Sequence, residues 1–431
     1  MLCLMPASSS RSSSPIDTRT EKTSIARRKP DNGNETLSAL MLPNYYFALP
    51  VKPRLAISER LNLAAKLTTI IPLRLGYYIA RLVFFALRNR FNARFYLTCA
   101  GVRMAFMSLS ARQLQHVSMT AKQTYEAWLQ QKAKTDGDGD DADQERLVHD
   151  IQPLEPVDAS ILWVGNRRKA NKFVLFFHGG GFISPPLAGH FEWCWNAYVQ
   201  SGVEQGVEVA VAFLQYTLSP GARFPTQLRQ AAAALGALLD AGVQPADIVI
   251  GGDSAGGNLT MQLLGHLLHP HEDARRIDLA EPLAAAFLVS PWLGCNTTSR
   301  SFRENENNDM LSKAIMEKLC TEYFGGAEGA SHAAAGGNAW AAPLDGDQNW
   351  LQGVDNLVPN IYVTVGKREV LADHGVGLVQ ALRRLSALGN IRLEESEGEA
   401  HDFILLEGQA NKAGDATKRM KDWFKSVVVA G

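Results

Sequence analysis

The sequence predicts an α/β fold in which a mainly parallel sheet is covered by helices on both faces. Beyond about residue 150, apolar runs without polar alternation take turns with helical segments, which is typical of strands buried on both sides. Two glycine-rich segments directly follow two of these runs. Parallel strands are joined by crossover helices, so functional groups should lie beyond the carboxyl ends of the strands.

Six apolar segments are predicted as strands, and three helical segments lie between them. The first of these helices has Pro225 at its start and Gly242 at its end, which are the usual boundary residues. The predicted strands lie within 172–181, 206–216, 246–254, 283–292, 360–366 and 391–398, and the helices within 225–242, 258–269 and 377–388.

Charge divides the chain of 431 residues into two parts. Residues 1–134 hold 20 Lys or Arg and 6 Asp or Glu, a balance of +14, and residues 135–431 hold 23 and 38, a balance of −15. We expect a disordered basic N-terminus over 1–37, a basic apolar helical region over 38–134, an acidic linker over 135–150 and an α/β domain over 151–431. The helical region is interpreted as a cap or as a membrane-surface segment.

Composition also suggests where the protein resides. Its five cysteines are scattered and odd in number, which favours a reducing compartment over a disulfide framework. The N-terminus lacks the apolar core of a secretory signal. We expect a protein that is not secreted and lies on the cytoplasmic side, with peripheral attachment to an intracellular membrane, such as the endoplasmic reticulum, as the alternative to a free state.

The segment 61–91 is strongly apolar, but Lys66, Pro72, Arg74 and Arg81 interrupt it. Its charge-free stretches are shorter than the roughly 20 apolar residues that span a bilayer, so a spanning helix is not predicted. Two alternatives stay open and are compatible. The segment lies in a membrane interface, or it covers the pocket or core of the following domain.

The stretch VIGGDSAGGNLT, residues 249–260, places Ser254 between a predicted strand and a predicted helix. Gly252 and Gly256 allow the close approach of strand and helix that such a sharp turn needs. This geometry exposes the serine as a nucleophile and points the N–H of Ala255 at the place where an oxyanion would form. The alternative is a glycine-rich turn with no catalytic role. The neighbouring motifs make this alternative less favoured.

The segment HGGGF, which begins at His178, ends another predicted strand 76 residues before the serine. Consecutive glycines let successive N–H groups face one point, as oxyanion stabilisation requires. We expect Gly179 and Gly180 to be donors together with Ala255. His178 is interpreted as a residue that orients the loop rather than as a base. Gly181 and Asp253 are assigned supporting roles in the same loops.

A nucleophilic serine needs a general base and an acid that orients it, and both should follow Ser254 near the last strands. His401 lies in the loop after the final predicted strand, and His374 is its only serious rival. Glu369 follows the preceding strand by three residues and is the predicted acid. Asp373 is the alternative acid, and its other expected role is to cap the next helix.

These motifs resemble those of the α/β-hydrolase fold, and within it the hormone-sensitive-lipase-like serine esterases. The resemblance covers roughly 165–430 and rests on HGGGF at 178, YTLSPGARFP at 216, GGDSAGGN at 251, VSPWLG at 289, EVLADHG at 369 and AHDF at 400. Glu369, where related enzymes usually carry Asp, and the segment WAAPLDGDQNW look similar to fungal steryl acetyl hydrolase-type proteins.

The resemblance implies a serine carboxylic-ester hydrolase that acts on a short-chain, acetyl-type ester of a hydrophobic alcohol or secondary metabolite. Ser254, His401 and Glu369 would be its triad, with no metal or cofactor and no nucleic-acid partner. Phe182 and Trp292 are the predicted pocket residues, and the helices near 40–130 and the insertion at 297–324 are the predicted cap that lines the pocket. Two alternatives stay open, namely a non-hydrolytic lyase, cyclase or acyltransferase of a biosynthetic pathway and a catalytically silent ligand receptor.

Overall fold

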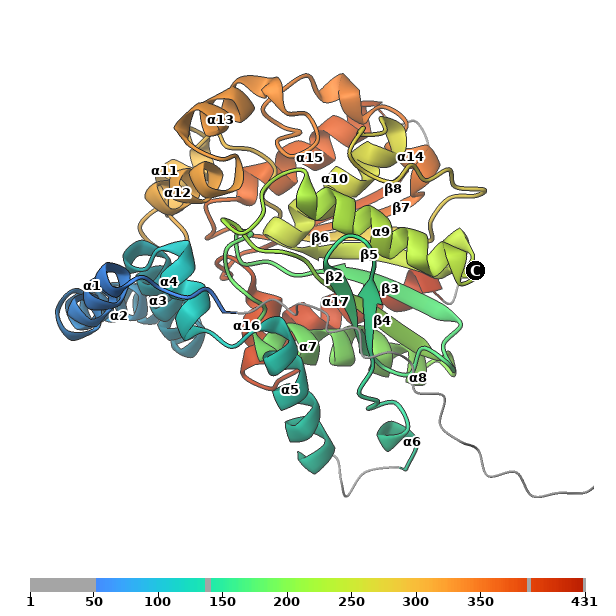
Figure 1. Ribbon diagram of the computed structural model, residues 1–431, viewed down its shortest axis with the longest axis horizontal. Coiled ribbons are helices and arrows are strands. Elements are labelled where there is room, and N and C mark those ends of the chain that lie inside the picture. Colours follow the sequence, from blue (N-terminus) through green and yellow to red (C-terminus); the bar gives the residue numbers. More distant parts are fainter. Residues whose placement is uncertain (1–51, 136–140, 386–388, 429–431) are drawn as a thin grey trace, which may run out of the picture. The chain divides into compact units, whose positions relative to one another are not determined.

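One eight-stranded sheet organises the protein in the computed structural model, which describes residues 52–135, 141–385 and 389–428 (Figure 1). The strand order is β1-β2-β4-β3-β5-β6-β7-β8. Only β2 runs against its neighbours, and β3 to β8 are mutually parallel, which confirms the predicted sheet. The strands are β1 Ile151–Leu154, β2 Ala159–Val164, β3 Lys172–Phe177, β4 Val209–Gln215, β5 Ile248–Asp253, β6 Ala285–Val289, β7 Asn360–Gly366 and β8 Asn390–Ser396.

The first two strands were not predicted from the sequence. They form an antiparallel hairpin in which Ile151 pairs with Leu162 and Leu154 pairs with Ala159. Strand β1 has only four residues and contains Pro153, so its pattern is too short to stand out. The predicted strands reappear, although most are shorter than the segments that predicted them.

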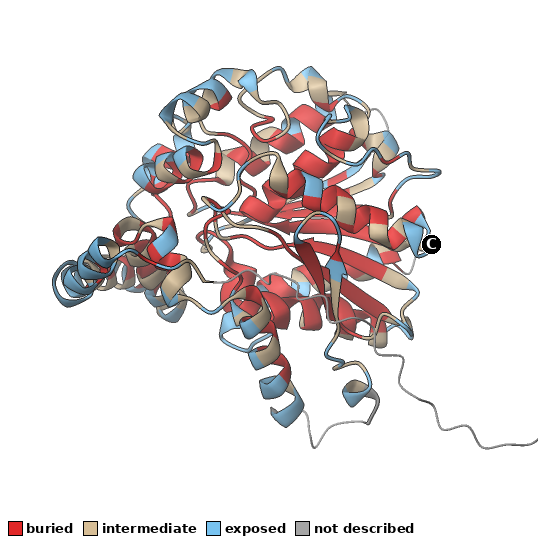
Figure 2. Cartoon of the chain, viewed as in Figure 1, coloured by how far each residue is buried: buried red, intermediate tan, exposed pale blue. Residues whose placement is uncertain are grey.

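Helices cover both faces of the sheet, and the strands between them are mostly buried (Figure 2). Alternate side chains of the strands belong to two different core clusters. Val174 and Phe176 of β3 belong to the core cluster that includes residues of α5, α7, η2 and α17, whereas Leu175 and Phe177 belong to the cluster that includes residues of α9, α10 and α15. The helices of this domain are α7 Ala188–Cys194, η2 Trp195–Val199, α8 Gln200–Val203, α9 Thr226–Asp240, η3 Pro245–Asp247, α10 Ala255–Leu268, α11 Arg300–Asn305, α12 Lys313–Tyr323, α13 Ala327–His332, η4 Ala333–Gly337, η5 Gln348–Leu351, α14 Val354–Leu357, α15 Ala372–Leu385, α16 Phe403–Gln409 and α17 Asp415–Val428.

The basic N-terminal region is helical. Helix α2 packs along α3, and Asn92 and Ser110 cap α3 and α4 by accepting backbone N–H groups. The elements are α1 Ile57–Ala65, η1 Lys66–Ile70, α2 Ile71–Arg88, α3 Ala93–Ser108, α4 Ala111–Val117 and α5 Ala121–Thr135. Among the described residues, the continuous run Ile57–Arg88 is the one helix long and apolar enough, by length and composition alone, to cross a membrane. The length of this continuous run was not predicted from the sequence, and contact of the segment with a membrane stays a prediction.

The acidic segment predicted as a linker has a described part, which includes α6 Asp141–Gln144. Arg146 ion-pairs with Glu208 at 2.5 Å, and Asp150 accepts from Arg167 at 2.7 Å. These contacts attach residues 146–150 to the α/β domain. The predicted disordered tail, residues 1–37, lies outside the described residues.

Candidate active site

Ser254 occupies the turn between β5 and α10. Its backbone has φ of 51°, in the left-handed region that non-glycine residues seldom adopt, and its N–H donates to the Val289 carbonyl at 2.8 Å. A Cβ on Gly252 or Gly256 would approach the Phe177 carbonyl oxygen to 2.0 or 1.8 Å. Both positions therefore require glycine if strand and helix are to meet at this turn.

His401 and Glu369 form a buried pair at the ends of β8 and β7. Nδ1 of His401 donates to Oε2 of Glu369 at 2.7 Å, and the Gly366 N–H donates to the other carboxylate oxygen at 2.9 Å. Glu369 has no exposed surface. Because Nδ1 carries the proton in this bond, Nε2 is the nitrogen left to accept one, and His401 lines the same cavity as Ser254.

The surroundings of His401 favour its protonated form. Burial lowers the pKa of the imidazole, but the hydrogen bond and charge of Glu369, with the nearby carboxyls of Asp309 and Asp253, raise it above its usual value. Burial raises the pKa of Glu369, against the opposing effect of His401. The imidazolium is therefore stabilised where a general base would have to hold a proton.

Asp309 is a site residue that the sequence did not reveal. Its fully buried carboxylate accepts three backbone N–H groups, from His401 at 3.1 Å, Val370 at 2.9 Å and Met310 at 2.7 Å. It thereby joins the loop that carries the base to the loop that carries Glu369. No motif surrounds it, and its only sequence signal was its place between residues 297 and 324, a predicted pocket-lining insertion.

Arg103 of α3 connects the N-terminal helices to this insertion. Its guanidinium, which is buried, donates to the carbonyl oxygens of Asp309 and Leu311, both at 2.7 Å. Burial of an arginine is costly unless its donors are bound, so these contacts fix α3 against the backbone beside Asp309. The N-terminal helices are thus part of the site rather than a separate appendage.

The glycine loop after β3 lines the same cavity as the base. Tyr216 donates to the His178 carbonyl at 2.6 Å and stacks on the imidazole, with ring centroids 4.3 Å apart. Burial and the neighbouring His190 lower the pKa of His178 to about 3, so it stays neutral. Within the described residues, the N–H groups of Gly180 and Gly181 bind no backbone acceptor. They remain as donors at the edge of the cavity, where both residues lie.

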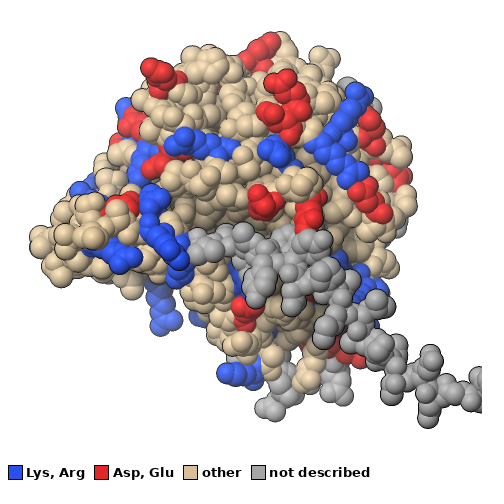
Figure 3. All heavy atoms as spheres, in the orientation of Figure 1, with Lys and Arg blue, Asp and Glu red and all other residues tan. Residues whose placement is uncertain are grey.

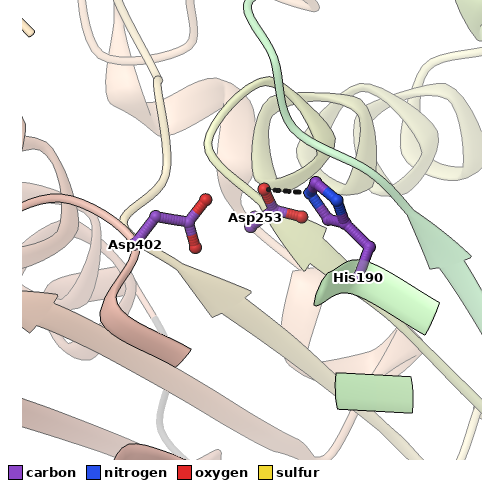
Figure 4. Close-up of side chains that lie close together, drawn as sticks. All are labelled: His190, Asp253 and Asp402. Atoms are coloured by element: carbon purple, nitrogen blue, oxygen red, sulfur yellow. Dashed lines mark hydrogen bonds and ion pairs between the residues drawn. The ribbon is translucent and has the colours of Figure 1, made fainter. Parts of the chain in front are cut away.

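A second polar cluster lies beneath this loop and consists of His190, Asp253 and Asp402 (Figure 4). Nε2 of His190 donates to Asp253 at 3.2 Å, because its Nδ1 accepts the Leu187 N–H. Burial and the charge of Asp253 raise the pKa of Asp402, which favours the protonated form of this carboxyl. A Cβ on Gly179 would lie 2.0 Å from Oδ2 of Asp253. The cluster therefore supports the glycine loop and the serine turn together, which agrees with the supporting role predicted for Asp253.

The cavity that contains Ser254 and His401 has a volume of about 170 Å³ and a mostly apolar wall. The N-terminal helices and the 297–324 insertion both contribute to its wall, as predicted from the sequence. Its apolar lining consists of Val102, Ala105, Phe106, Leu114, Pro185, Leu187, Met310, Leu311, Leu319, Leu405 and Leu406. A second hollow of about 260 Å³ borders His178 and Tyr216 and contains neither Ser254 nor His401.

The predicted pocket residues Phe182 and Trp292 do not line this cavity, and that prediction is wrong. Phe182 is completely buried and stacks on Tyr323 with ring centroids 4.1 Å apart, and Trp292 is 1% exposed. Both belong to the aromatic core behind the glycine loop. Aromatic residues next to a site motif fill the core here, whereas the cavity wall is built mainly from aliphatic residues together with Phe106 of α3.

The rival residues have other partners. Asp373 accepts the Ser301 N–H at 2.8 Å, so it holds α11 rather than the imidazole of His401. His374 accepts the Leu293 N–H at 3.1 Å through Nδ1, and burial lowers its pKa to about 4. Neither residue lines the cavity of Ser254.

The sheet order, the strained serine turn and the glycine loop define an α/β protein with nucleophile-elbow geometry. The chain belongs to the alpha/beta hydrolase fold family, whose sequence pattern matches residues 174–405. Curated relatives include an acetyl-hydrolase of Streptomyces hygroscopicus, 28% identical over 51% of this chain and 64% of that protein. Bovine arylacetamide deacetylase is 32% identical over 35% of this chain and 37% of that protein.

An esterase of Acinetobacter venetianus is 27% identical over 47% of this chain and 59% of that protein, so the match spans less than two thirds of these relatives. Solved structures share the fold. An esterase of the bacterial hormone-sensitive lipase family superposes with a TM-score of 0.51 at 23% identity, over 77% of this chain and 97% of that one. Carboxyl esterase 2 of Tuber melanosporum superposes with a TM-score of 0.52 at 18% identity, over 64% of this chain and 86% of that one.

Proposed function

We propose that this protein is a serine carboxylic-ester hydrolase. The supporting observation is that Ser254, on its strained turn, shares one small cavity with His401, whose other ring nitrogen donates to the buried Glu369. This is the arrangement in which an imidazole can accept the serine proton while a carboxylate holds its tautomer. The relatives named as esterases and acetyl-hydrolase agree with it.

The proposed mechanism has two acyl-transfer steps. Ser254 Oγ attacks the ester carbonyl carbon while Nε2 of His401 takes its proton, and the same nitrogen returns that proton to the departing alcohol. Water then attacks the acyl-serine with His401 again as base, and Ser254 regains its proton. The proposed oxyanion donors are the N–H groups of Gly179, Gly180 and Ala255, and the N–H of Gly181 at the same cavity edge is a further candidate. Each such donor contributes about 10²- to 10³-fold in rate.

The proposed substrate is a short-chain, acetyl-type ester of a hydrophobic alcohol or secondary metabolite. A cavity of about 170 Å³ leaves little room for a long acyl chain, and its aliphatic wall favours apolar groups. The names of the acetyl-hydrolase and arylacetamide deacetylase relatives point in the same direction. Steryl acetates are the narrower candidate to be tested.

The experiment measures hydrolysis of p-nitrophenyl esters from acetate to decanoate. We expect the highest kcat/KM at acetate, and loss of activity and of fluorophosphonate labelling in Ser254→Ala. Ser426→Ala is the matched control, because Ser426 is exposed on α17 and bonds only within that helix. Activity that survives in Ser254→Ala would overturn the proposal.

A second measurement separates hydrolysis from the other acyl chemistries. In water labelled with ¹⁸O, hydrolysis through an acyl-serine places one label in the released acid. Turnover without incorporation of label would indicate transfer, cyclisation or elimination instead. Tight ligand binding without any turnover would indicate a receptor.

A further inference from the structure

The helical run Ile57–Arg88 exposes large apolar side chains to solvent. Leu73 is 77% exposed, and Phe84 and Leu87 are each 64% exposed, whereas most of the described large apolar residues elsewhere are buried. Figure 2 shows this outer side of α1 and α2 as mainly exposed. The exposed apolar residues of the run are Ile57, Leu61, Leu67, Ile70, Leu73, Tyr77, Phe84 and Leu87.

The opposite side of the same run is packed into the protein. Ile71, Tyr78, Leu82 and Ala86 of α2 are buried against the rest of the N-terminal helices, at spacings of seven, four and four residues. The exposed residues 73, 77, 84 and 87 recur at similar spacings, so α2 has two apolar sides and only one of them is covered. An uncovered apolar side of this length indicates a contact surface.

Positive charge accompanies this surface. From Arg60 to Tyr125 the sequence contains ten Lys or Arg and no Asp or Glu. Arg88 and Arg94 are exposed, and their side chains have no partner within the described residues. In Figure 3 the end of the molecule formed by α1 and α2 is mostly uncharged surface with blue patches beside it.

We propose that the exposed side of Ile57–Arg88, together with Arg88 and Arg94, docks on the surface of an anionic lipid bilayer. Apolar side chains enter the boundary between headgroups and acyl chains, and the arginines bind lipid phosphates and carboxylates. A symmetric contact with a second copy is disfavoured, because it would bring a basic region against itself, and Glu59, the one acidic residue of residues 57–125, is already paired with Arg112.

The contacts of the run place it in the plane of the membrane rather than across it. Lys66 donates to Gln113 at 3.0 Å, and Arg74 donates to the Met107 carbonyl at 3.0 Å and to Ser108 at 3.2 Å. A spanning helix would have to break these bonds and separate α2 from α3. Because α3 also lines the cavity, docking would hold the active-site wall next to the lipid surface.

The test uses the full chain and sedimentation with vesicles of phosphatidylcholine containing 30% phosphatidylserine, and with pure phosphatidylcholine. We expect binding to the anionic vesicles that falls at least about tenfold without phosphatidylserine or in 0.5 M NaCl. The variant Leu73→Gln/Phe84→Gln/Leu87→Gln should lose at least about tenfold in affinity. Val148→Gln is its control, because Val148 is exposed elsewhere in the chain.

The charge variant is Arg88→Gln/Arg94→Gln, for which we expect roughly a 25-fold loss on anionic vesicles, about fivefold for each arginine. Its matched control is Arg168→Gln/Arg229→Gln, two exposed arginines of the α/β domain whose side chains also have no partner within the described residues. Circular dichroism and hydrolysis of a soluble acetate ester verify that the variants are folded. Ser254→Ala should bind vesicles like the wild type, so failure of the proposed esterase activity would not affect this result.

Three results would overturn the proposal. Equal vesicle binding by the apolar variant and the wild type would exclude this surface. Dimerisation that the apolar variant abolishes, without vesicle binding, would indicate a second copy as the occupant. Retention on vesicles after carbonate washing would indicate a spanning helix instead of an in-plane one.

Discussion

Oδ1 of Asp309 accepts the backbone N–H of His401 at 3.1 Å, which ties the proposed general base to the insertion between β6 and β7. The other oxygen of the same carboxylate accepts the N–H of Val370, the residue that follows Glu369. One buried side chain therefore sets the distance between the base loop and the acid loop. Arg103 in turn binds the carbonyl of Asp309, so the N-terminal helices share in this positioning.

We predict that Asp309→Asn lowers kcat by about 10- to 100-fold on a soluble acetate ester with little change in KM. The amide keeps one acceptor but presents an NH₂ group to one of the backbone donors, so one of the two loops loses its anchor. Asp345→Asn is the matched control, because Asp345 also accepts backbone N–H groups, at Cys295 and Asn296, but does not line the cavity. Equal losses in both variants, or loss of folding alone, would contradict a positioning role for Asp309.

The pH profile of kcat/KM should depend on Glu369. Because the pKa of His401 is raised, its inactive protonated form persists to higher pH, and wild-type activity should fall as pH drops through a value above about 6.5. In Glu369→Gln the negative charge is lost, and the amide offers one acceptor oxygen to two donors, His401 Nδ1–H and the Gly366 N–H. The pKa of His401 therefore falls and the acid limb moves to lower pH. The plateau rate should also drop by about 10³- to 10⁴-fold.

The control for this profile is Glu407→Gln. Glu407 is a buried carboxylate that accepts N–H groups from Ala416 and Thr417 and makes no bond to His401. Its replacement should leave the acid limb in place. An unchanged limb in Glu369→Gln would mean that another group orients the imidazole.

Local patterns predicted those parts of the site that depend on local backbone geometry. Ser254 needs glycines two residues before and after it, so its turn is visible in the sequence, and His178 is fixed in the same way by the glycines that follow it. Asp309 and Arg103 act through contacts across 92 and 206 residues, which leave no periodic or short-range pattern. Phe182 shows a second limit of the sequence. A ring next to a site motif can face either the cavity or the core, and proximity to the motif does not distinguish the two.

Tyr216→Phe tests whether the glycine loop must be held for turnover. Loss of the hydroxyl removes the 2.6 Å bond to the His178 carbonyl while the ring stack remains. We expect kcat to fall about tenfold with KM nearly unchanged, since the loop contributes oxyanion donors only in the transition state. Tyr362→Phe, which loses a hydroxyl bond to Glu394 far from the cavity, should retain wild-type kcat. A tenfold rise in KM alone in Tyr216→Phe would instead assign the loop to ground-state binding.

The acyl preference should be set in part by Phe106 of α3, which lines the cavity and is 8% exposed. Phe106→Ala removes a ring from the wall, so the preferred p-nitrophenyl ester should shift from acetate toward butyrate or hexanoate. Phe173→Ala is the matched control, because Phe173 is also 8% exposed but packs against Trp163 away from Ser254. Both variants should lose about 3 to 5 kcal/mol of stability, which thermal unfolding measures. If both keep the acetate preference, the N-terminal helices do not limit the acyl chain, and the insertion that contains Leu311 and Leu319 becomes the wall to test.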